Sequence, residues 1–332
     1  MGGSLPSVPI LAARHGKVAQ ALSEQFCEVG RGITLCYEEF GERSDPCALL
    51  VMGLGVQMIG WHEDFCRKLA DAGFHVLRFD NRDVGHSTHV RGAPPTARQL
   101  LTRSRRAAHY TLADMADDAA GLLRELDLAP AHVIGASMGG MIAQTLAVRH
   151  PEMVRSLTSI MSSTGRRTSG QPSLRLYSLF LRRAPREREA FAAHMERVFT
   201  AIGSPGFPRD IEDVGALARD SFDRDRDPEG AGRQLAAIIA SGDRTHELRG
   251  IRTPTLVIHG SADTLVAPSG GRATARAIPD ATLMTIKGMG HDLPRALWPR
   301  LIDAIAQHAR RADVSAQSGP PLQAPPPSVP GL

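Results

Sequence analysis

The sequence predicts an α/β fold with a mostly parallel central sheet flanked by helices, and two patterns support this prediction. The first is a set of short apolar runs typical of strands buried on both faces, at residues 48–52, 76–79, 133–134 and 256–258. The second is a set of segments with helical periodicity, at residues 64–72, 112–126, 138–150 and 294–310. Strands and helices that alternate in this way form a parallel sheet covered by helices. Further strands are expected at residues 33–40, 156–161 and 282–286.

One interval interrupts the alternation. From residue 164 to residue 248 the strand patterns vanish, and Arg, Ala and Leu recur at helical spacing. The strand pattern resumes at Thr255, so we expect a helical cap insertion, residues 164–248, in an α/β core of residues 25–163 and 249–312. Residues 1–24 are expected to be a flexible leader. Six of the last thirteen residues are proline, so residues 313–332 are expected to be a disordered Pro-rich tail.

Composition excludes several classes of protein. No run approaches the roughly 18 apolar residues of a membrane span. The net charge of +4 is dispersed, and two Trp and three Tyr leave few rings for stacking on bases, so no nucleic-acid partner is expected. The four cysteines lie in the first fifth of the chain without a C-x-x-C pair. We therefore expect buried free thiols and a cytoplasmic location.

The most informative motif contains Ser137. Residues 135–139 read Gly-Ala-Ser-Met-Gly, follow a buried strand and open an apolar helix. This is the G-x-S-x-G pattern of a nucleophile elbow, a sharp strand-to-helix turn that exposes a serine hydroxyl. Because the pattern also arises by chance in glycine-rich chains, its assignment depends on the partners of the serine.

A serine hydroxyl is a weak nucleophile unless a histidine accepts its proton and an acid orients that histidine. Asp263 follows the strand that begins at Thr255, and His291 follows the strand at residues 282–286. The chain order Ser137, Asp263, His291 is the one expected for a nucleophile elbow. In an alternative arrangement the acid follows the strand at residues 156–161, but Ser162, the residue after that strand, begins a stretch without a carboxylate. Asp263 is therefore the expected acid.

A tetrahedral intermediate also requires two backbone N–H donors for its oxyanion. One donor is expected from Met138, and the other from Leu54 in the loop that follows residues 48–52. This loop is not a dinucleotide fingerprint, because Met58 stands where G-x-G-x-x-G requires glycine. No cofactor and no metal are expected. The charged loop at residues 80–87 is assigned a structural role.

The stretches VMGLG, FDNRDVGHS, GASMGGMIAQ, HGSADTLV and GMGHDLP resemble the α/β-hydrolase fold superfamily, and within it the esterase group that includes the aclacinomycin methylesterases. The likeness extends over residues 26–308 and is loosest between residues 164 and 248. It implies an α/β-hydrolase fold, with Ser137 as nucleophile, His291 as base, Asp263 as its orienting acid and the same two oxyanion donors. Met52 stands where the commonest pattern of the superfamily has a His-Gly pair. This departure matches the methylesterase-like group.

These observations predict a serine hydrolase that cleaves a carboxylic ester of a small to medium, mainly apolar molecule through an acyl-enzyme. Serine rather than aspartate at position 137 argues against an epoxide hydrolase or a haloalkane dehalogenase. Cofactor-free haloperoxidase, thioesterase, lactonase and C–C bond hydrolase activities use the same triad and are kept as alternatives. A non-catalytic ligand-binding module is a further alternative. The insertion is expected to determine the substrate.

Overall fold

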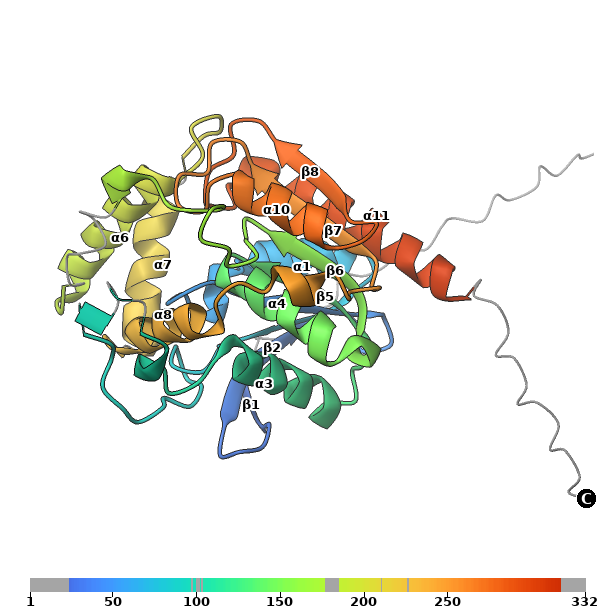
Figure 1. The fold of residues 1–332 in the computed structure, drawn as a ribbon, viewed down its shortest axis with the longest axis horizontal. Helices are drawn as coiled ribbons and strands as arrows, with labels where there is room; N and C mark the ends of the chain where they lie inside the picture. The colour runs from blue at the N-terminus through green and yellow to red at the C-terminus, as the bar shows by residue number, and fades with distance from the viewer. Residues whose placement is uncertain are drawn as a thin grey trace, which may run out of the picture.

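Eight strands form one sheet at the centre of the molecule (Figure 1). The computed structural model describes residues 24–96, 98–99, 102, 104–176, 185–209, 211–225 and 227–317. The strands are β1 (Gln25–Glu28), β2 (Thr34–Phe40), β3 (Cys47–Val51), β4 (His75–Phe79), β5 (Ala131–Ala136), β6 (Val154–Ile160), β7 (Thr255–Gly260) and β8 (Thr282–Ile286). Their spatial order is β1-β2-β4-β3-β5-β6-β7-β8. In this spatial order, the β1–β2 and β2–β4 pairs are antiparallel. The remaining pairs, from β4–β3 to β7–β8, are parallel, which confirms the predicted fold class.

Helices cover both faces of the sheet. On one face lie α1 (Glu63–Asp71) and α11 (Trp298–Gln317), and on the other lie α3 (Leu112–Glu125), α4 (Met138–Arg149) and α10 (Ser269–Ala277). Strand β3 contributes to both cores, because Leu49 and Val51 pack toward α3 and α4 while Ala48 and Leu50 pack toward α1 and α11. None of the helices in the described ranges is long and apolar enough to span a bilayer.

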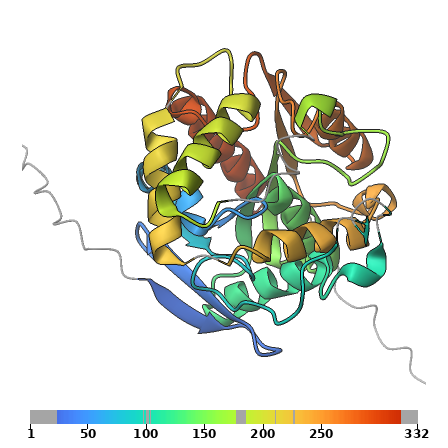
Figure 2. The same ribbon diagram turned by 90° about the vertical axis from the view of Figure 1, so that its left-hand side faces the viewer.

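Between β6 and β7 the described chain is helical. This β6–β7 segment, residues 161–254, contains α6 (Arg188–Ile202), α7 (Ile211–Arg224), α8 (Gly230–Ser241) and the short α9 (Thr245–Leu248). Helices α6 and α7 pack side by side at one end of the molecule, and Figure 2 shows them in front of the sheet. This is the interval in which the sequence predicted an insertion.

The C-terminal helix corrects one predicted boundary. The expected tail begins at residue 313, but α11 continues to Gln317. Ala312 is buried, and the Asp313 carboxylate accepts a hydrogen bond from Arg155 at 3.1 Å, so this last part of the helix is anchored to the core. The rest of the expected tail and residues 1–23 lie outside the described residues.

All four cysteines are buried and free, as the sequence predicted. The β1–β2 register pairs Cys27 with Leu35 and Cys36 with Phe26. Because side chains alternate along a strand, the thiols of Cys27 and Cys36 point to opposite faces of the hairpin. Burial raises the pKa of Cys47 to about 12, so this thiol stays protonated and unreactive at neutral pH.

A buried histidine on α11 makes stability depend on pH. Burial lowers the pKa of His308, whose Nε2 atom lies 3.2 Å from the carbonyl oxygen of Pro254. The unfolded chain therefore binds this proton more readily than the folded chain, and the stabilisation is lost as the pH falls below about 6.5. We expect the melting temperature, measured by calorimetry, to fall less between pH 7.5 and pH 5.5 in His308→Gln than in wild type. Parallel losses in the two proteins would contradict this.

Candidate active site

Ser137 lies at the junction between β5, which ends at Ala136, and α4, which begins at Met138. Its backbone has φ 56° and ψ −118°, a conformation that L-residues rarely adopt. The Ser137 N–H donates to the carbonyl oxygen of Ile160 at 2.9 Å, and this bond holds the turn against the end of β6. The strained turn presents the serine side chain at the carboxyl edge of the sheet.

Glycine is required on both sides of this turn. A Cβ at Gly135 would overlap the carbonyl oxygen of Gly139, and a Cβ at Gly139 would overlap the carbonyl oxygen of Val51. The start of α4 therefore packs directly on the backbones of β3 and β5. This close approach gives a physical reason for both glycines of the G-x-S-x-G pattern.

The three predicted side chains form one chain of hydrogen bonds. The Ser137 Oγ atom lies 2.9 Å from Nε2 of His291, and Nδ1 of His291 lies 2.8 Å from Oδ2 of Asp263. An ionised carboxylate only accepts hydrogen bonds, so we assign the proton to Nδ1, which leaves Nε2 free to accept the serine proton. The side chains of His291 and Asp263 are only 6% and 0% exposed, so water competes little for these bonds.

Asp263 is held in one orientation by its surroundings. Its second oxygen, Oδ1, accepts hydrogen bonds from the backbone N–H groups of Leu265 and Val266 at 2.9 and 2.8 Å. These bonds fix the carboxylate plane in the turn after β7. The aspartate is therefore already oriented toward His291 before any substrate arrives.

Ser162, two residues after the end of β6, has a role that the sequence did not reveal. Ser162 Oγ donates a hydrogen bond at 2.8 Å to the backbone carbonyl oxygen of Ser137. Ser162 thus ties β6 to the turn that carries the nucleophile. The sequence signal for Ser162 was its position directly after the strand predicted at residues 156–161, where some hydrolases carry the acid.

The two predicted oxyanion donors come from different parts of the chain: Met138 is next to the nucleophile in sequence, and the loop of Leu54 packs against it in space. A Cβ at Gly53, the residue before Leu54, would lie 3.2 Å from the Cβ of Ser137. Met138 directly follows Ser137 at the first position of α4, where backbone N–H groups have no partner within the helix. Within the described ranges, neither Leu54 nor Met138 donates its N–H to another residue. Both groups are thus available to a substrate oxygen.

The loop that carries His291 is held by the end of α6. The N–H of His291 donates to the carbonyl oxygen of Ile202 at 2.8 Å, and the N–H of Gly290 donates to Oγ of Ser204 at 2.8 Å. Ser204 in turn donates to the carboxyl group of Asp292, and burial raises the pKa of that carboxyl. The β6–β7 segment therefore supports the position of the histidine.

The charged loop at residues 80–87 joins the core to the β6–β7 segment. The buried carboxylate of Asp80 accepts from the N–H of Met58 at 2.6 Å and pairs with Arg224 of α7 at 2.9 Å. The buried carboxylate of Asp83 pairs with Arg233 of α8 at 2.8 Å. Both acids act in packing, in agreement with the structural role expected for this loop.

Among the residues that the structure describes, two groups of side chains have the spacing of metal ligands, and we assign a metal to neither. They are Glu24, Cys36 and His86, and Asp83, His89 and Asp227. An arginine already supplies the positive charge in each group, because Arg224 pairs with Glu24 at 2.6 Å and Arg233 pairs with both aspartates. Burial also raises the pKa of the Cys36 thiol, which disfavours the thiolate that a metal would bind.

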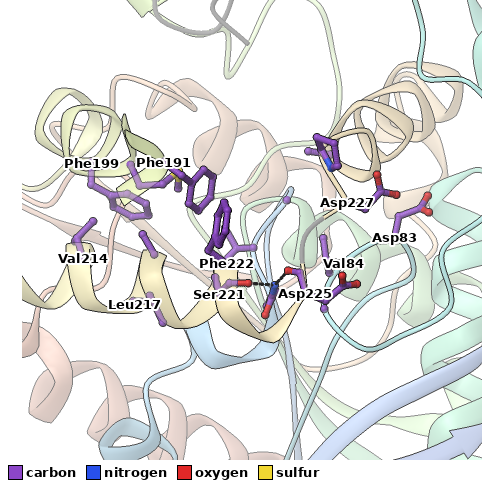
Figure 3. Close-up of a pocket in the computed structure, with 18 residues that line it drawn as sticks. Asp83, Val84, Phe191, Phe199, Val214, Leu217, Ser221, Phe222, Asp225 and Asp227 are labelled. Carbon is purple, nitrogen blue, oxygen red and sulfur yellow. Dashed lines mark hydrogen bonds between the residues drawn. The ribbon is translucent and has the colours of Figure 1, made fainter. Parts of the chain in front are cut away.

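A mainly apolar cavity of about 170 Å³ lies between the core loops and the β6–β7 segment (Figure 3). Gly55 and Val56, which directly follow Leu54, line it from the core side. Figure 3 shows Phe191 of α6 facing Phe222 of α7, and the centroids of their rings are 5.9 Å apart. The cavity thus reaches the residues that follow the predicted oxyanion donor and extends between α6 and α7, and Leu54, Ser137 and His291 are not among its lining residues.

The family of the chain is decided by a match over most of its length. Residues 49–294 match the family described as the alpha/beta hydrolase fold. The chain belongs to this family. The matched range contains Ser137, Asp263 and His291, and the resemblance to α/β hydrolases that the motifs implied is confirmed.

Known proteins similar to this α/β hydrolase include methylesterases. Rhodomycin D methylesterase DnrP of Streptomyces peucetius is 27% identical over 319 residues, which cover 85% of this chain and 97% of that protein. A pimeloyl-acyl-carrier-protein methyl ester esterase of Chromobacterium violaceum is 30% identical over 194 residues, 58% of this chain and 75% of that protein. Among solved structures, the enol-lactonase of Burkholderia xenovorans LB400 has a TM-score of 0.65 and 26% identity, and covers 87% of this chain and 100% of that chain.

Proposed function

We propose that this α/β hydrolase cleaves carboxylic esters with Ser137 as nucleophile, His291 as general base and acid, and Asp263 as the residue that orients the histidine. The observation that supports this most directly is the continuous hydrogen-bond chain from Ser137 Oγ through the imidazole to the buried carboxylate. The strained turn at Ser137 and the two free backbone N–H groups beside it supply the other parts that acyl transfer requires.

The reaction follows from this geometry in two steps. Ser137 Oγ bonds to the ester carbonyl carbon while His291 Nε2 takes the hydroxyl proton, and the N–H groups of Leu54 and Met138 bind the oxyanion. The bond to the alcohol oxygen then breaks, and the alcohol leaves with the proton from Nε2. A water molecule next attacks the acyl-enzyme, gives a proton to Nε2, and releases the acid as the serine recovers that proton. Asp263 stabilises the imidazolium in both steps.

We further propose that the substrate is a methyl ester of a mainly apolar acid. Two of the similar proteins are named as methyl ester esterases, which supports a small alcohol. Methanol needs little space as a leaving group, so the cavity between α6 and α7 is assigned to the acyl part. Its apolar walls favour an acid that carries an aliphatic or aromatic body.

A panel of esters tests this proposal. Methyl, ethyl and butyl esters of one apolar acid would be compared with methyl acetate and with a lactone of similar size, by titration of the released acid. We expect the largest kcat/KM for the methyl ester of the apolar acid. Equal rates for all the methyl esters would contradict the assignment of the cavity to the acyl part of the substrate. A strong preference for the lactone would favour the lactonase alternative.

Filling the cavity should change the choice of substrate. Ala218 of α7 lines the cavity and is 5% exposed, so Ala218→Leu would place a larger side chain in it. We expect the KM for the apolar methyl ester to rise about tenfold or more while hydrolysis of methyl acetate stays unchanged. Ala216→Leu on the exposed side of the same helix is the matched control. Equal effects of the two variants would show that the cavity does not hold the acyl part.

A further inference from the structure

A glutamine of the β6–β7 segment is fully buried against the loop after β3. Gln234 of α8 is 0% exposed, and its Oε1 atom accepts a hydrogen bond from the N–H of Gly55 at 2.8 Å. Its Nε2 atom donates to the backbone carbonyl oxygen of Arg82 at 2.8 Å. The side chain therefore joins two core loops, one after β3 and one after β4, although it belongs to a distant part of the sequence.

Gly55 is the residue directly after Leu54, and contacts with α8 fix the position of Gly55. Its φ of +68° is in the left-handed region that favours glycine, and a Cβ there would lie 3.0 Å from the Cβ of Ala231. Ala231 and Gln234 are three residues apart, so they lie on the same face of α8. The turn at Gly55 is thus packed on one residue of α8 and hydrogen-bonded to another.

The core holds the earlier part of the same loop. Asn81 donates a hydrogen bond through Nδ2 to the backbone carbonyl oxygen of Met52 at 3.0 Å. The Gly53–Leu54 peptide group, which carries the N–H of Leu54, lies between this contact and the bond from Gly55 to Gln234. An oxyanion donor is useful only if it points at the developing charge before the reaction begins. The two hydrogen bonds on either side of Leu54 hold its N–H in one place before the reaction begins.

We infer that Gln234 is a positioning residue for the oxyanion donor Leu54, so that α8 contributes to the rate of the reaction as well as to the walls of the cavity. This inference rests on the proposed function, because it assigns Gln234 a role through the N–H of Leu54. A positioning residue of this kind acts through Leu54, unlike the residues that contact the substrate directly. Loss of its side chain should weaken transition-state binding and leave ground-state binding intact.

Gln234→Met tests the inference, because methionine has a similar length and makes neither hydrogen bond. We expect kcat for methyl esters to fall about 10- to 100-fold with KM unchanged. An arylboronic acid, which forms a tetrahedral adduct with an active-site serine, should bind more weakly by a similar factor, whereas the acid product should bind as in wild type. A purely structural role would not separate these two affinities.

Ile238→Ala is the matched control, since Ile238 lies on the same helix and packs against the hydrophobic core. It should lower the melting temperature and leave kcat unchanged. The inference is overturned if Gln234→Met keeps the wild-type kcat and boronic acid affinity, or if its losses match those of Ile238→Ala. Wild type that neither hydrolyses the ester nor binds the boronic acid would instead overturn the proposed function.

Discussion

Replacement of Ser137 by alanine is expected to lower kcat for ester hydrolysis by at least about 10⁴-fold. Alanine removes the hydroxyl that forms the acyl-enzyme and leaves His291 without its 2.9 Å partner. Because the methyl group fits the same turn, the fold should remain intact. The measurement is the steady-state rate with the preferred methyl ester, together with the melting temperature.

Ser315→Ala, at an exposed position on α11, is the control for this experiment and should retain the wild-type rate. A Ser137→Ala protein that keeps a tenth or more of the wild-type activity would exclude a serine acyl-enzyme at this site. The activity would then have to come from another nucleophile or from a water molecule activated directly by His291.

Asp263→Asn is expected to lower kcat by about 10³- to 10⁴-fold. Asparagine can still accept the N–H bonds of Leu265 and Val266, so the turn after β7 should persist. Its amide group can donate to Nδ1 of His291, however, and this favours the tautomer with the proton on Nε2. That tautomer cannot accept the proton of Ser137.

The control for this variant is Asp303→Asn on the exposed side of α11. Within the described ranges, the Asp303 carboxylate accepts hydrogen bonds only from Gln307. It should leave kcat unchanged. A loss of less than about tenfold in Asp263→Asn, at an unchanged melting temperature, would show that Asp263 does not orient the base.

The central strands were predictable because they are buried on both faces, as in β3, β4 and β5. Strand β8 has the predicted bounds of residues 282–286, and β3 differs from its predicted range by one residue at each end. Strand β5 is longer than the predicted apolar run because His132 and Gly135 interrupt the run but remain in the ladder. The end of α11 was missed because the ion pair of Asp313 with Arg155 is a long-range contact.

The three side chains that meet at the site could be named from the sequence because each follows a strand at the same edge of the sheet. The residues that support these three side chains could not be named from the sequence. Gln234, Ser204 and Ser162 have no motif, and their importance follows from hydrogen bonds to loops far away in the sequence or on a neighbouring strand. Periodicity reports which face of an element is buried and carries no information about such pairs.

These contacts change the expected role of the β6–β7 segment. The sequence assigned it to substrate choice, and the cavity between α6 and α7 supports that role. The segment also holds the loop of His291 through Ser204 and the loop of Leu54 through Gln234. Under the proposed function, substrate binding and catalytic geometry would therefore depend on the same helices.

The central claim is that Ser137 is the nucleophile, and reaction with a fluorophosphonate followed by peptide mass mapping tests it most directly. We expect one adduct per molecule of folded wild type, located on Ser137, and none in Ser137→Ala. Labelling should also be slower in Asp263→Asn, because the same base activates the serine toward the probe. An adduct on any other residue, or folded wild type that remains unlabelled, would contradict the account.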